Sequence, residues 1–202
     1  MIAKEVFRKF LHMLAFAALI LWLYALEDWR RSVLIAACAI VVITPCLILL
    51  SRIPGISEAI VARRRGEFAY SFIAYAMAYI VTATVLWGYF GKRGLVVACF
   101  FAWAPGDAAA ALIGKTFGKH KIGISGKKSM EGSGAMAFCS FVGVLCVLLY
   151  FNLYSNFLAI VISLVTAICT AVAELLDEKG LDTFFCPVTA MVILSIFELI
   201  LR

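Results

Sequence analysis

Long apolar stretches separated by short polar segments make up most of this sequence. A bilayer core of about 30 Å is crossed by about 20 mostly apolar helical residues. Seven stretches approach that length, and they run from Phe10 to Leu26, Val33 to Leu50, Phe68 to Phe90, Leu95 to Ile113, Gly134 to Phe151, Phe157 to Leu176 and Thr183 to Leu201. The pattern predicts an all-α polytopic membrane bundle of about seven transmembrane helices.

The composition excludes a water-soluble fold. Of the 202 residues, 65% are hydrophobic and only 15% are charged, which leaves too few polar side chains to cover the surface of a soluble domain. The chain shows no repeat of fixed period and has no room for a separate soluble domain. We therefore expect residues 1–202 to form a single transmembrane domain.

Basic residues are distributed unevenly between the two ends of the predicted bundle. Of the 18 Lys and Arg residues, 13 fall on the side of the N-terminus and 5 on the opposite side. Because loops rich in Lys and Arg stay in the cytoplasm, the N-terminus is predicted to be cytoplasmic and the C-terminus to lie outside. The net charge of +6 is thus first an orientation signal, and no nucleic-acid partner is expected.

The residues best suited to chemistry are predicted to lie on this cytoplasmic face, and Asp107 is the first of them. It lies within the fourth apolar stretch, where an ionised carboxylate costs about 2.5 kcal/mol or more unless it faces a cavity or a cation. Ala110, Ala111 and Gly114 share its helix face and would let a neighbouring helix or a lipid chain approach closely. The alternative is a buried aspartate satisfied by a nearby arginine or lysine.

A basic loop that contains four glycines follows Asp107. Its five lysines are Lys115, Lys119, Lys121, Lys127 and Lys128. Lysines bind phosphate through their charge, and glycines let backbone N–H groups approach it. The next predicted helix begins near Gly134, so its positive dipole end points to the same place. The loop predicts a polyphosphate site, and the alternative is a solvated basic loop that binds anionic lipid headgroups.

Four acidic residues can be brought to the cytoplasmic end of the bundle: Asp107, Glu131, Glu67 and Glu174. Carboxylates there would hold Mg²⁺ against the phosphates of a nucleotide or act as a general base. The spacing alone does not assign these roles.

Three further features concern the helices themselves. Pro105 and Gly106 favour a break in the fourth helix, of the kind that transporters often have, and we interpret such a break as opening the nucleotide site. Glu198 is followed four residues later by Arg202, and we interpret the two as an ion pair without a catalytic role. His12 lies alone on an apolar helix and by itself is interpreted as a packing residue.

These residues resemble the CTP-dependent lipid-alcohol kinases, a family that includes dolichol kinase, the phytol and farnesol kinases and the yeast-type diacylglycerol kinase. The resemblance covers most of the chain and rests on motifs in the same order along it. The motif residues are Glu5, Arg8, Lys9 and His12, then Arg64, Gly66 and Glu67, then the segments 106–121, 127–133 and 174–187. Thr183 stands where the family usually has Asn.

The resemblance implies transfer of the γ-phosphoryl group of CTP to the hydroxyl of a membrane lipid alcohol, such as a polyprenol, dolichol or phytol, with Mg²⁺ as cofactor. It implies that Asp107, Glu131 and Lys128 are catalytic and that Asp107 and Glu131 hold the metal. The other residues it implies at the binding site are Lys115, Lys119, Lys121, Lys127, Ser129, Gly132, Arg8, Glu67, Glu174 and Asp182.

Two alternatives stay open. A phosphatidate cytidylyltransferase would use the same nucleotide but would join CMP to a lipid phosphate; the long motif of that family, with its paired acids beside a KDxG element, is absent. A transporter or scaffold with a lipid-binding basic face would tolerate Asp107→Ala, whereas a kinase would lose transfer. The sequence leaves the identity of the alcohol and the association of several copies of the chain open.

Overall fold

The computed structural model describes residues 2–53, 67–123, 128–177 and 180–202, and nearly all of them are helical. The helices are α1 (Ile2–Ala25), α2 (Trp29–Leu50), α4 (Glu67–Thr82), the π-helix η1 (Ala83–Tyr89), α5 (Arg93–Thr116), α6 (Met130–Tyr150), α7 (Asn156–Leu176) and α8 (Asp182–Ile200). Two short strands, β1 (Lys121–Ile122) and β2 (Lys128–Ser129), pair antiparallel between α5 and α6.

The prediction of an all-α polytopic bundle is confirmed. Within the described part of the chain, seven helical spans are long and apolar enough to cross a membrane, and α4 and η1 together form the third of them. The observed helices begin or end a few residues away from the predicted apolar stretches, because charged residues such as Glu131 occupy helical first turns. A prediction based on counting apolar residues omits these charged residues, although the backbone there is already helical.

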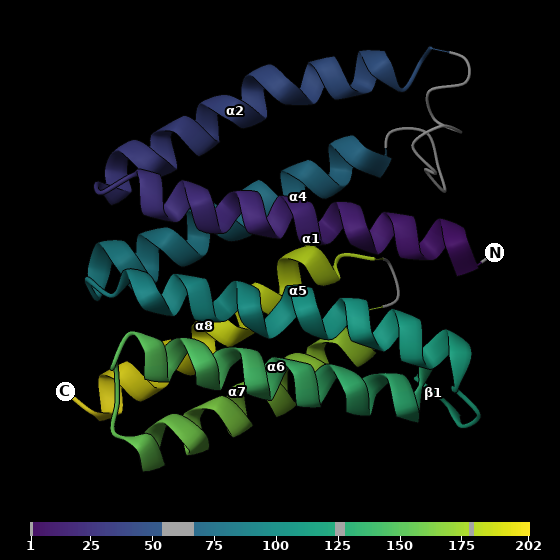
Figure 1. Ribbon diagram of the computed structural model, residues 1–202. Helices are drawn as coiled ribbons and strands as arrows, with labels where there is room; N and C mark the ends of the chain where they lie inside the picture. The colour runs from purple at the N-terminus through teal and green to yellow at the C-terminus, as the bar shows by residue number, and fades with distance from the viewer. Residues whose placement is uncertain (1, 54–66, 124–127, 178–179) are drawn as a thin grey trace.

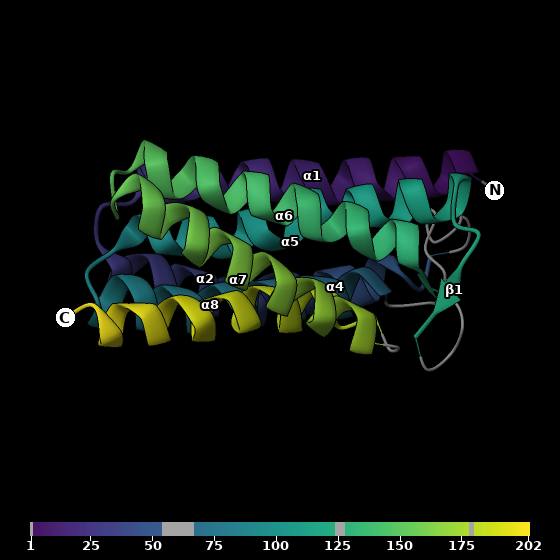
Figure 2. The same ribbon diagram turned by 90° about the horizontal axis from the view of Figure 1, so that it is seen from below.

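The helices run up and down the bundle, so alternate connections meet at the same end (Figures 1 and 2). One end carries the start of α1, the two strands and the start of α8, and we call it the hairpin end. The other end carries the end of α8 and the turn between α6 and α7, and we call it the opposite end. The helix ends that border the connections predicted to share the cytoplasmic side therefore lie together at the hairpin end.

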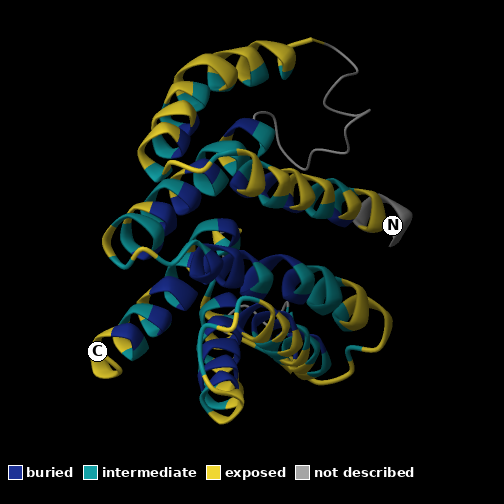
Figure 3. Ribbon diagram, turned by 60° about the vertical axis from the view of Figure 1, so that its left-hand side comes forward, coloured by how far each residue is buried: buried dark blue, intermediate teal, exposed yellow. Residues whose placement is uncertain are grey.

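Helix α5 forms the centre of the bundle and is the most buried span (Figure 3). It packs most extensively against α6, and also against α8 and α1, whereas α2 lies at the periphery against α4 and η1. Glycines bring α5 and α6 close together: a Cβ atom on Gly132 would lie 2.9 Å from the Ala110 carbonyl oxygen, and one on Gly106 would lie 2.6 Å from Ser140 Oγ. Part of the small-residue face predicted on α5 is thus used by a neighbouring helix.

Helix α5 continues without interruption through Pro105, so the predicted break in it is wrong. Proline lacks the N–H group that would bond to the carbonyl of Phe101. Helix α6 packs closely there, since a Cβ atom on Gly143 would lie 3.1 Å from that carbonyl oxygen. One residue further, the hydroxyl of Ser140 donates to the carbonyl of Ala102. Close packing and a side-chain donor from α6 support the helix across the proline.

The interpretation of Glu198 and Arg202 as an ion pair is also wrong. The carboxylate of Glu198 pairs with Lys92, whose Nζ lies 2.8 Å from Glu198 Oε1, and it accepts a hydrogen bond from Tyr154. The guanidinium of Arg202 instead lies over the rings of Tyr89 and Phe90, 5.5 and 5.1 Å from their centroids. Contacts between helices replace the local pair that the spacing suggested.

Candidate functional site

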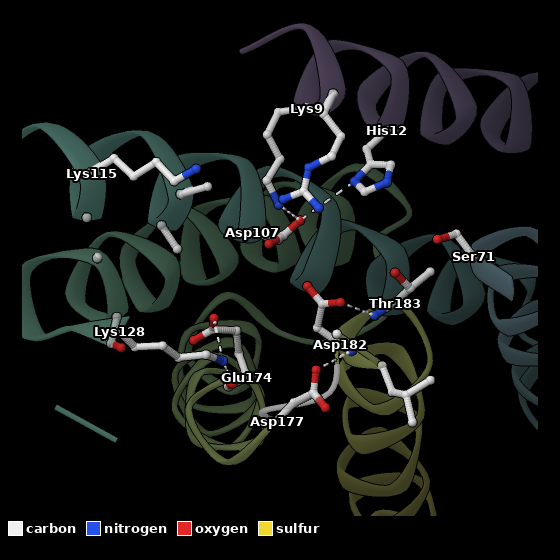
Figure 4. Close-up of a pocket in the computed structure, with 18 of the residues that line it drawn as sticks. Lys9, His12, Ser71, Asp107, Lys115, Lys128, Glu174, Asp177, Asp182 and Thr183 are labelled. Carbon is white, nitrogen blue, oxygen red and sulfur yellow. Dashed lines mark hydrogen bonds and ion pairs between the residues drawn. The ribbon is translucent and has the colours of Figure 1, made fainter. Parts of the chain in front are cut away.

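A cavity of about 1170 Å³ opens at the hairpin end and is lined by residues of α1, α4, α5, α6, α7, α8 and both strands (Figure 4). Among the described residues that line it, five are basic and five are acidic. The basic residues are Arg8, Lys9, Lys115, Lys121 and Lys128, and the acidic residues are Glu67, Asp107, Glu174, Asp177 and Asp182. The cavity is therefore polar on its walls and formally balanced in charge.

Asp107 lies at the centre of an ionic cluster between α1, α5 and α8. Lys9 Nζ donates to Asp107 Oδ2, and both residues are buried, at 5% and 6% exposure. The side chain of Asp182 also interacts with Asp107, and His12 Nδ1 lies 4.0 Å from Asp107 Oδ2. Two carboxylates thus share one close lysine, which leaves a negative charge that a proton or a cation would neutralise.

The turn before α8 holds Asp182 in position. Asp177 Oδ2 accepts a hydrogen bond of 2.9 Å from the Asp182 backbone N–H, and Asp182 Oδ1 accepts one of 2.9 Å from the Thr183 N–H. Gly180 has a φ of +77°, a backbone conformation that favours glycine, so the chain can turn sharply there. The Asp182 carboxylate lines the cavity and points toward Asp107 (Figure 4).

The other wall of the cavity is basic. Lys128 Nζ lies 2.8 Å from Glu174 Oε1 and also donates to the Glu174 carbonyl, which joins β2 to the end of α7. Lys115 extends from the last turn of α5 toward the same space (Figure 4). Ser129 caps α6, because its hydroxyl accepts a hydrogen bond of 3.1 Å from the Gly132 N–H. The positive end of α6 and the lysines around it face one region, as the sequence predicts.

Most of the residues predicted for the site line this one cavity. They are Arg8, Glu67, Asp107, Lys115, Lys121, Lys128, Ser129, Gly132, Glu174 and Asp182. Their roles remain predictions. Lys127 lies outside the described residues, so the structure says nothing of it.

Glu131 and Lys119 are not among the residues that line the cavity. The Glu131 carboxylate lies 2.8 Å from His120 Nδ1 and accepts a further hydrogen bond of 3.3 Å from the His120 backbone N–H. This contact ties the start of α6 to the segment before β1. Asp107 and Glu131, the predicted metal pair, are therefore not brought to a common point, whereas Asp107 and Asp182 are.

Sequence analysis assigned no site role to Lys9 or Asp177, although both line the cavity. The available signal for Lys9 was its place in the first motif, between Arg8 and His12; the structure places it inside the first membrane span, where a charged side chain is costly without a partner. His12, interpreted as a packing residue, also lines the cavity, and Nδ1 of its ring is buried with no hydrogen-bond partner. For Asp177 the signal was weaker, because an acid in a polar turn is common.

The described residues contain no group of three or more His, Cys, Asp or Glu side chains that could hold a metal ion. A divalent cation at this site would take protein ligands from Asp107 and Asp182 and complete its coordination with phosphate oxygens or water. Such sparse protein ligation is the usual arrangement for Mg²⁺ bound with a nucleotide.

Comparison with known proteins gives two matches. The family model described as the cytidylyltransferase family matches residues 1–177, which includes all of the predicted site residues except Asp182. A phytol kinase of Synechocystis sp. is 28% identical over 195 residues, which cover 94% of this chain and 78% of that protein. No solved structure matches this chain significantly.

Proposed function

This chain belongs to the cytidylyltransferase family, and on that premise we propose that it transfers the γ-phosphoryl group of CTP to the hydroxyl group of a membrane lipid alcohol. The similarity to a phytol kinase along nearly the whole chain supports a kinase. The observation that carries the proposal is the pair of carboxylates, buried Asp107 and half-buried Asp182, beside Lys9 in a cavity whose other wall is lined with lysines.

The cavity has a deep side and a shallow side, and this asymmetry suits two substrates of different solubility. Asp107 lies nine residues before the end of α5, a distance of about 13 Å along the helix. Ala74 lies seven residues after the start of α4, about 10 Å along that helix. Lys128 and Ser129 instead lie in β2, outside the helices. A nucleotide would occupy the shallow basic side, and the lipid hydroxyl would enter the deep side.

The residues present fit a divalent cation at Asp107 and Asp182. Both are hard oxygen donors, they lie next to each other, and Lys9 neutralises only one of their two charges. When bound, Mg²⁺ would neutralise charge on the phosphate oxygens of CTP. We expect chelation by EDTA to abolish transfer and added Mg²⁺ to restore it. Substitution of Asp182 by Asn should raise the Mg²⁺ concentration needed for half-maximal transfer, whereas Glu131→Gln should leave it unchanged.

Phosphoryl transfer requires little covalent chemistry from the protein, so position and charge dominate. The alcohol oxygen forms a bond to the γ-phosphorus, the bond from that phosphorus to the β–γ bridging oxygen breaks, and CDP leaves. The proton of the hydroxyl passes to a carboxylate oxygen of the Asp107–Asp182 pair. Lys115, Lys121 and Lys128 hold the phosphates, and their positive charges stabilise the charge on the departing CDP.

The test is a transfer assay with purified protein in detergent, Mg²⁺ and γ-labelled CTP. A panel of farnesol, geranylgeraniol, phytol, a long polyprenol and diacylglycerol would report the alcohol that accepts the label. We expect labelled lipid phosphate and an equal amount of CDP. Absence of label from every lipid, in a preparation that binds CTP, would contradict the proposal and favour a transporter or lipid-binding protein.

The description of the matched family favours a second candidate, transfer of a cytidylyl group to a lipid phosphate. That reaction joins CMP to the lipid and releases pyrophosphate, so it moves the α-phosphorus and not the γ-phosphorus. CTP labelled differently at the two positions separates the candidates in one assay with phytol and phosphatidate as acceptors. Label from the α-position in a lipid product would replace the kinase by a cytidylyltransferase.

The hairpin end is proposed to face the cytoplasm, where CTP is made available to the basic side of the cavity. The support is the concentration of Lys and Arg at that end. Single cysteines at Lys119 and at Asn152, in a chain without its native cysteines, would report sidedness through a membrane-impermeant maleimide. We expect Asn152 to be labelled in intact cells and Lys119 only after permeabilisation; the reverse pattern would invert the topology.

A further inference from the structure

Helices α1 and α4 border the deep side of the cavity and contact each other on either side of one stretch. Near the hairpin end, Arg8 Nη1 lies 3.6 Å from Glu67 Oε1. Deeper in the bundle, the Tyr75 hydroxyl donates a hydrogen bond of 3.1 Å to the Ala15 carbonyl. Between these two contacts, His12 of α1 and Ser71 and Ala74 of α4 line the cavity. We call this stretch the α1–α4 window.

The two helices that frame the window pack mainly against other partners. Helix α1 packs against α5, whereas α4 packs against α2, η1 and α8 (Figure 1). Among the described residues, no comparable packing joins α1 to α4. Eight residues separate Glu67 from Tyr75, so the window is about 12 Å long on α4.

The residues that line the window keep exposed surface although they lie within membrane-spanning segments. The side chain of His12 is 27% exposed although it lies within the first membrane span, and Ser71 and Ala74 are partly exposed within the third. Tyr70, on the rim, is 74% exposed. Small side chains at Ser71 and Ala74 leave this part of α4 without bulk that would close the opening.

At the window, the ring of His12 has a nitrogen atom that lacks a hydrogen-bond partner among the described residues. Its Nδ1 atom is buried and forms no hydrogen bond within the described part of the chain, and it lies 4.0 Å from Asp107 Oδ2. A buried polar atom without a partner is unfavourable, so such atoms usually find one in the protein, water or a ligand. A hydroxyl group placed between His12 and Asp107 would satisfy the ring nitrogen beside the reacting carboxylates.

We propose that the lipid alcohol enters from the bilayer through the α1–α4 window, with its hydroxyl held between His12 and Asp107 and its chain left between the two helices. This inference rests on the proposed lipid kinase function. It makes Ala74 and Ser71 the positions on α4 that control access of the lipid but not of the nucleotide. CTP reaches its phosphate-binding lysines from the hairpin end without passing this window.

The first experiment narrows the window without altering a charged residue. Ala74→Phe should raise the apparent KM for farnesol at least about tenfold, since an aromatic ring would occupy the opening. Its KM for CTP should stay within about twofold of the wild type. Ala18→Phe is the matched control, because Ala18 lies on the exposed face of α1 and does not line the cavity. An unchanged KM for farnesol in folded Ala74→Phe would overturn the window.

A second experiment does not depend on activity or on the folding of a variant. Wild-type protein is irradiated with a farnesol analogue that carries a diazirine on its chain, and the labelled peptides are mapped. We expect labels on α1 and α4 that excess farnesol removes. Labels confined to α6 or α7 would overturn the window even if the wild type is a kinase. Labels on α1 and α4 without γ-label transfer would overturn the proposed function and leave the window as a lipid site.

Discussion

Each end of the bundle pairs a lysine with a buried carboxylate, and the two pairs differ in their surroundings. At the opposite end, Glu198 is shared by Lys92 and Tyr154, and the Lys92 ammonium also lies 5.1 Å from the centroid of the Tyr154 ring. Burial and then the hydrogen bond to Glu198 raise the pKa of Tyr154, so its hydroxyl stays protonated and donates. This cluster is balanced in charge and joins the turn after α6 to α8.

At the hairpin end, Lys9 pairs with Asp107, but a second carboxylate, Asp182, stands beside them and a cavity lies in front. One charge remains without a close partner of opposite sign. Both ends contain a lysine–carboxylate pair, so such a pair alone does not single out the hairpin end. What distinguishes the hairpin end is a second carboxylate beside the pair and a cavity in front of it.

The largest effect should come from Asp107→Asn. We expect transfer to fall by at least about 100-fold, because the carboxylate near the reacting groups is lost. The buried Lys9 would also lose its hydrogen-bonded carboxylate, but Asp182 remains beside it, so the loss of stability should be smaller than the loss of about 3–5 kcal/mol expected when a buried charge is left without any partner. Transfer assays and thermal unfolding in detergent measure the two effects.

The double variant Lys9→Met/Asp107→Leu separates the loss of transfer from the loss of stability. Replacing a buried pair by apolar groups of similar size is often neutral for stability, so the fold should recover while transfer does not. Transfer near the wild-type rate in this double variant would mean that the hairpin-end pair is as purely structural as its counterpart.

Asp182→Asn should have the next largest effect on transfer, and it should not destabilise the fold. Transfer should fall by about 10- to 100-fold. Stability should stay the same or increase, since the substitution removes the repulsion between two neighbouring carboxylates. A variant that is less stable than the wild type would show that the second carboxylate supports the fold, and the contrast between the two ends would weaken.

Glu198→Gln tests whether the ion pair at the opposite end affects stability but not transfer. The side chain of Glu198 is 6% exposed and that of Lys92 is 35% exposed, so the lysine can turn toward water when its partner is neutral. We expect a loss of about 1–3 kcal/mol in stability. Transfer per folded molecule should not change. If KM or kcat shifted in folded protein, the opposite end would have to be coupled to the cavity.

Lys121→Ala should give the smallest effect. Lys121 is exposed and lines the cavity, so its loss should raise the KM for CTP by up to about fivefold. Lys119→Ala is the matched control from the same loop, because Lys119 is exposed but does not line the cavity. Equal effects of the two substitutions would favour a diffuse basic surface over a defined phosphate site.

Much of the fold follows from the apolar stretches, because only a helix satisfies its own backbone in a bilayer and its minimum length is set by the membrane. The alternation of spans then assigns each loop to an end. This is why Asp107, the lysine loop and Asp182 could be expected to meet before any contact was known.

The partners of the charged residues could not be predicted in the same way. Lys9 reaches Asp107 across 98 positions, and Lys92 reaches Glu198 across 106. A sequence shows which side chains are costly to bury but not which neighbour offsets the cost, since rotation of each helix about its axis decides that. The continuous path of α5 through Pro105 depends likewise on α6, whose contacts the local sequence does not contain.

The close contact of Gly114 and Gly132 has a mechanical consequence. A Cβ atom on Gly132 would lie 3.2 Å from the Gly114 Cα atom, so the end of α5 and the start of α6 meet with almost no side-chain volume between them. The two helices and the strands between them form a stiff unit, because there is little material at the contact to deform. Helix α1 packs against α5 but is not part of this unit, so a shift of α1 at the cavity would leave the contact between Gly114 and Gly132 intact.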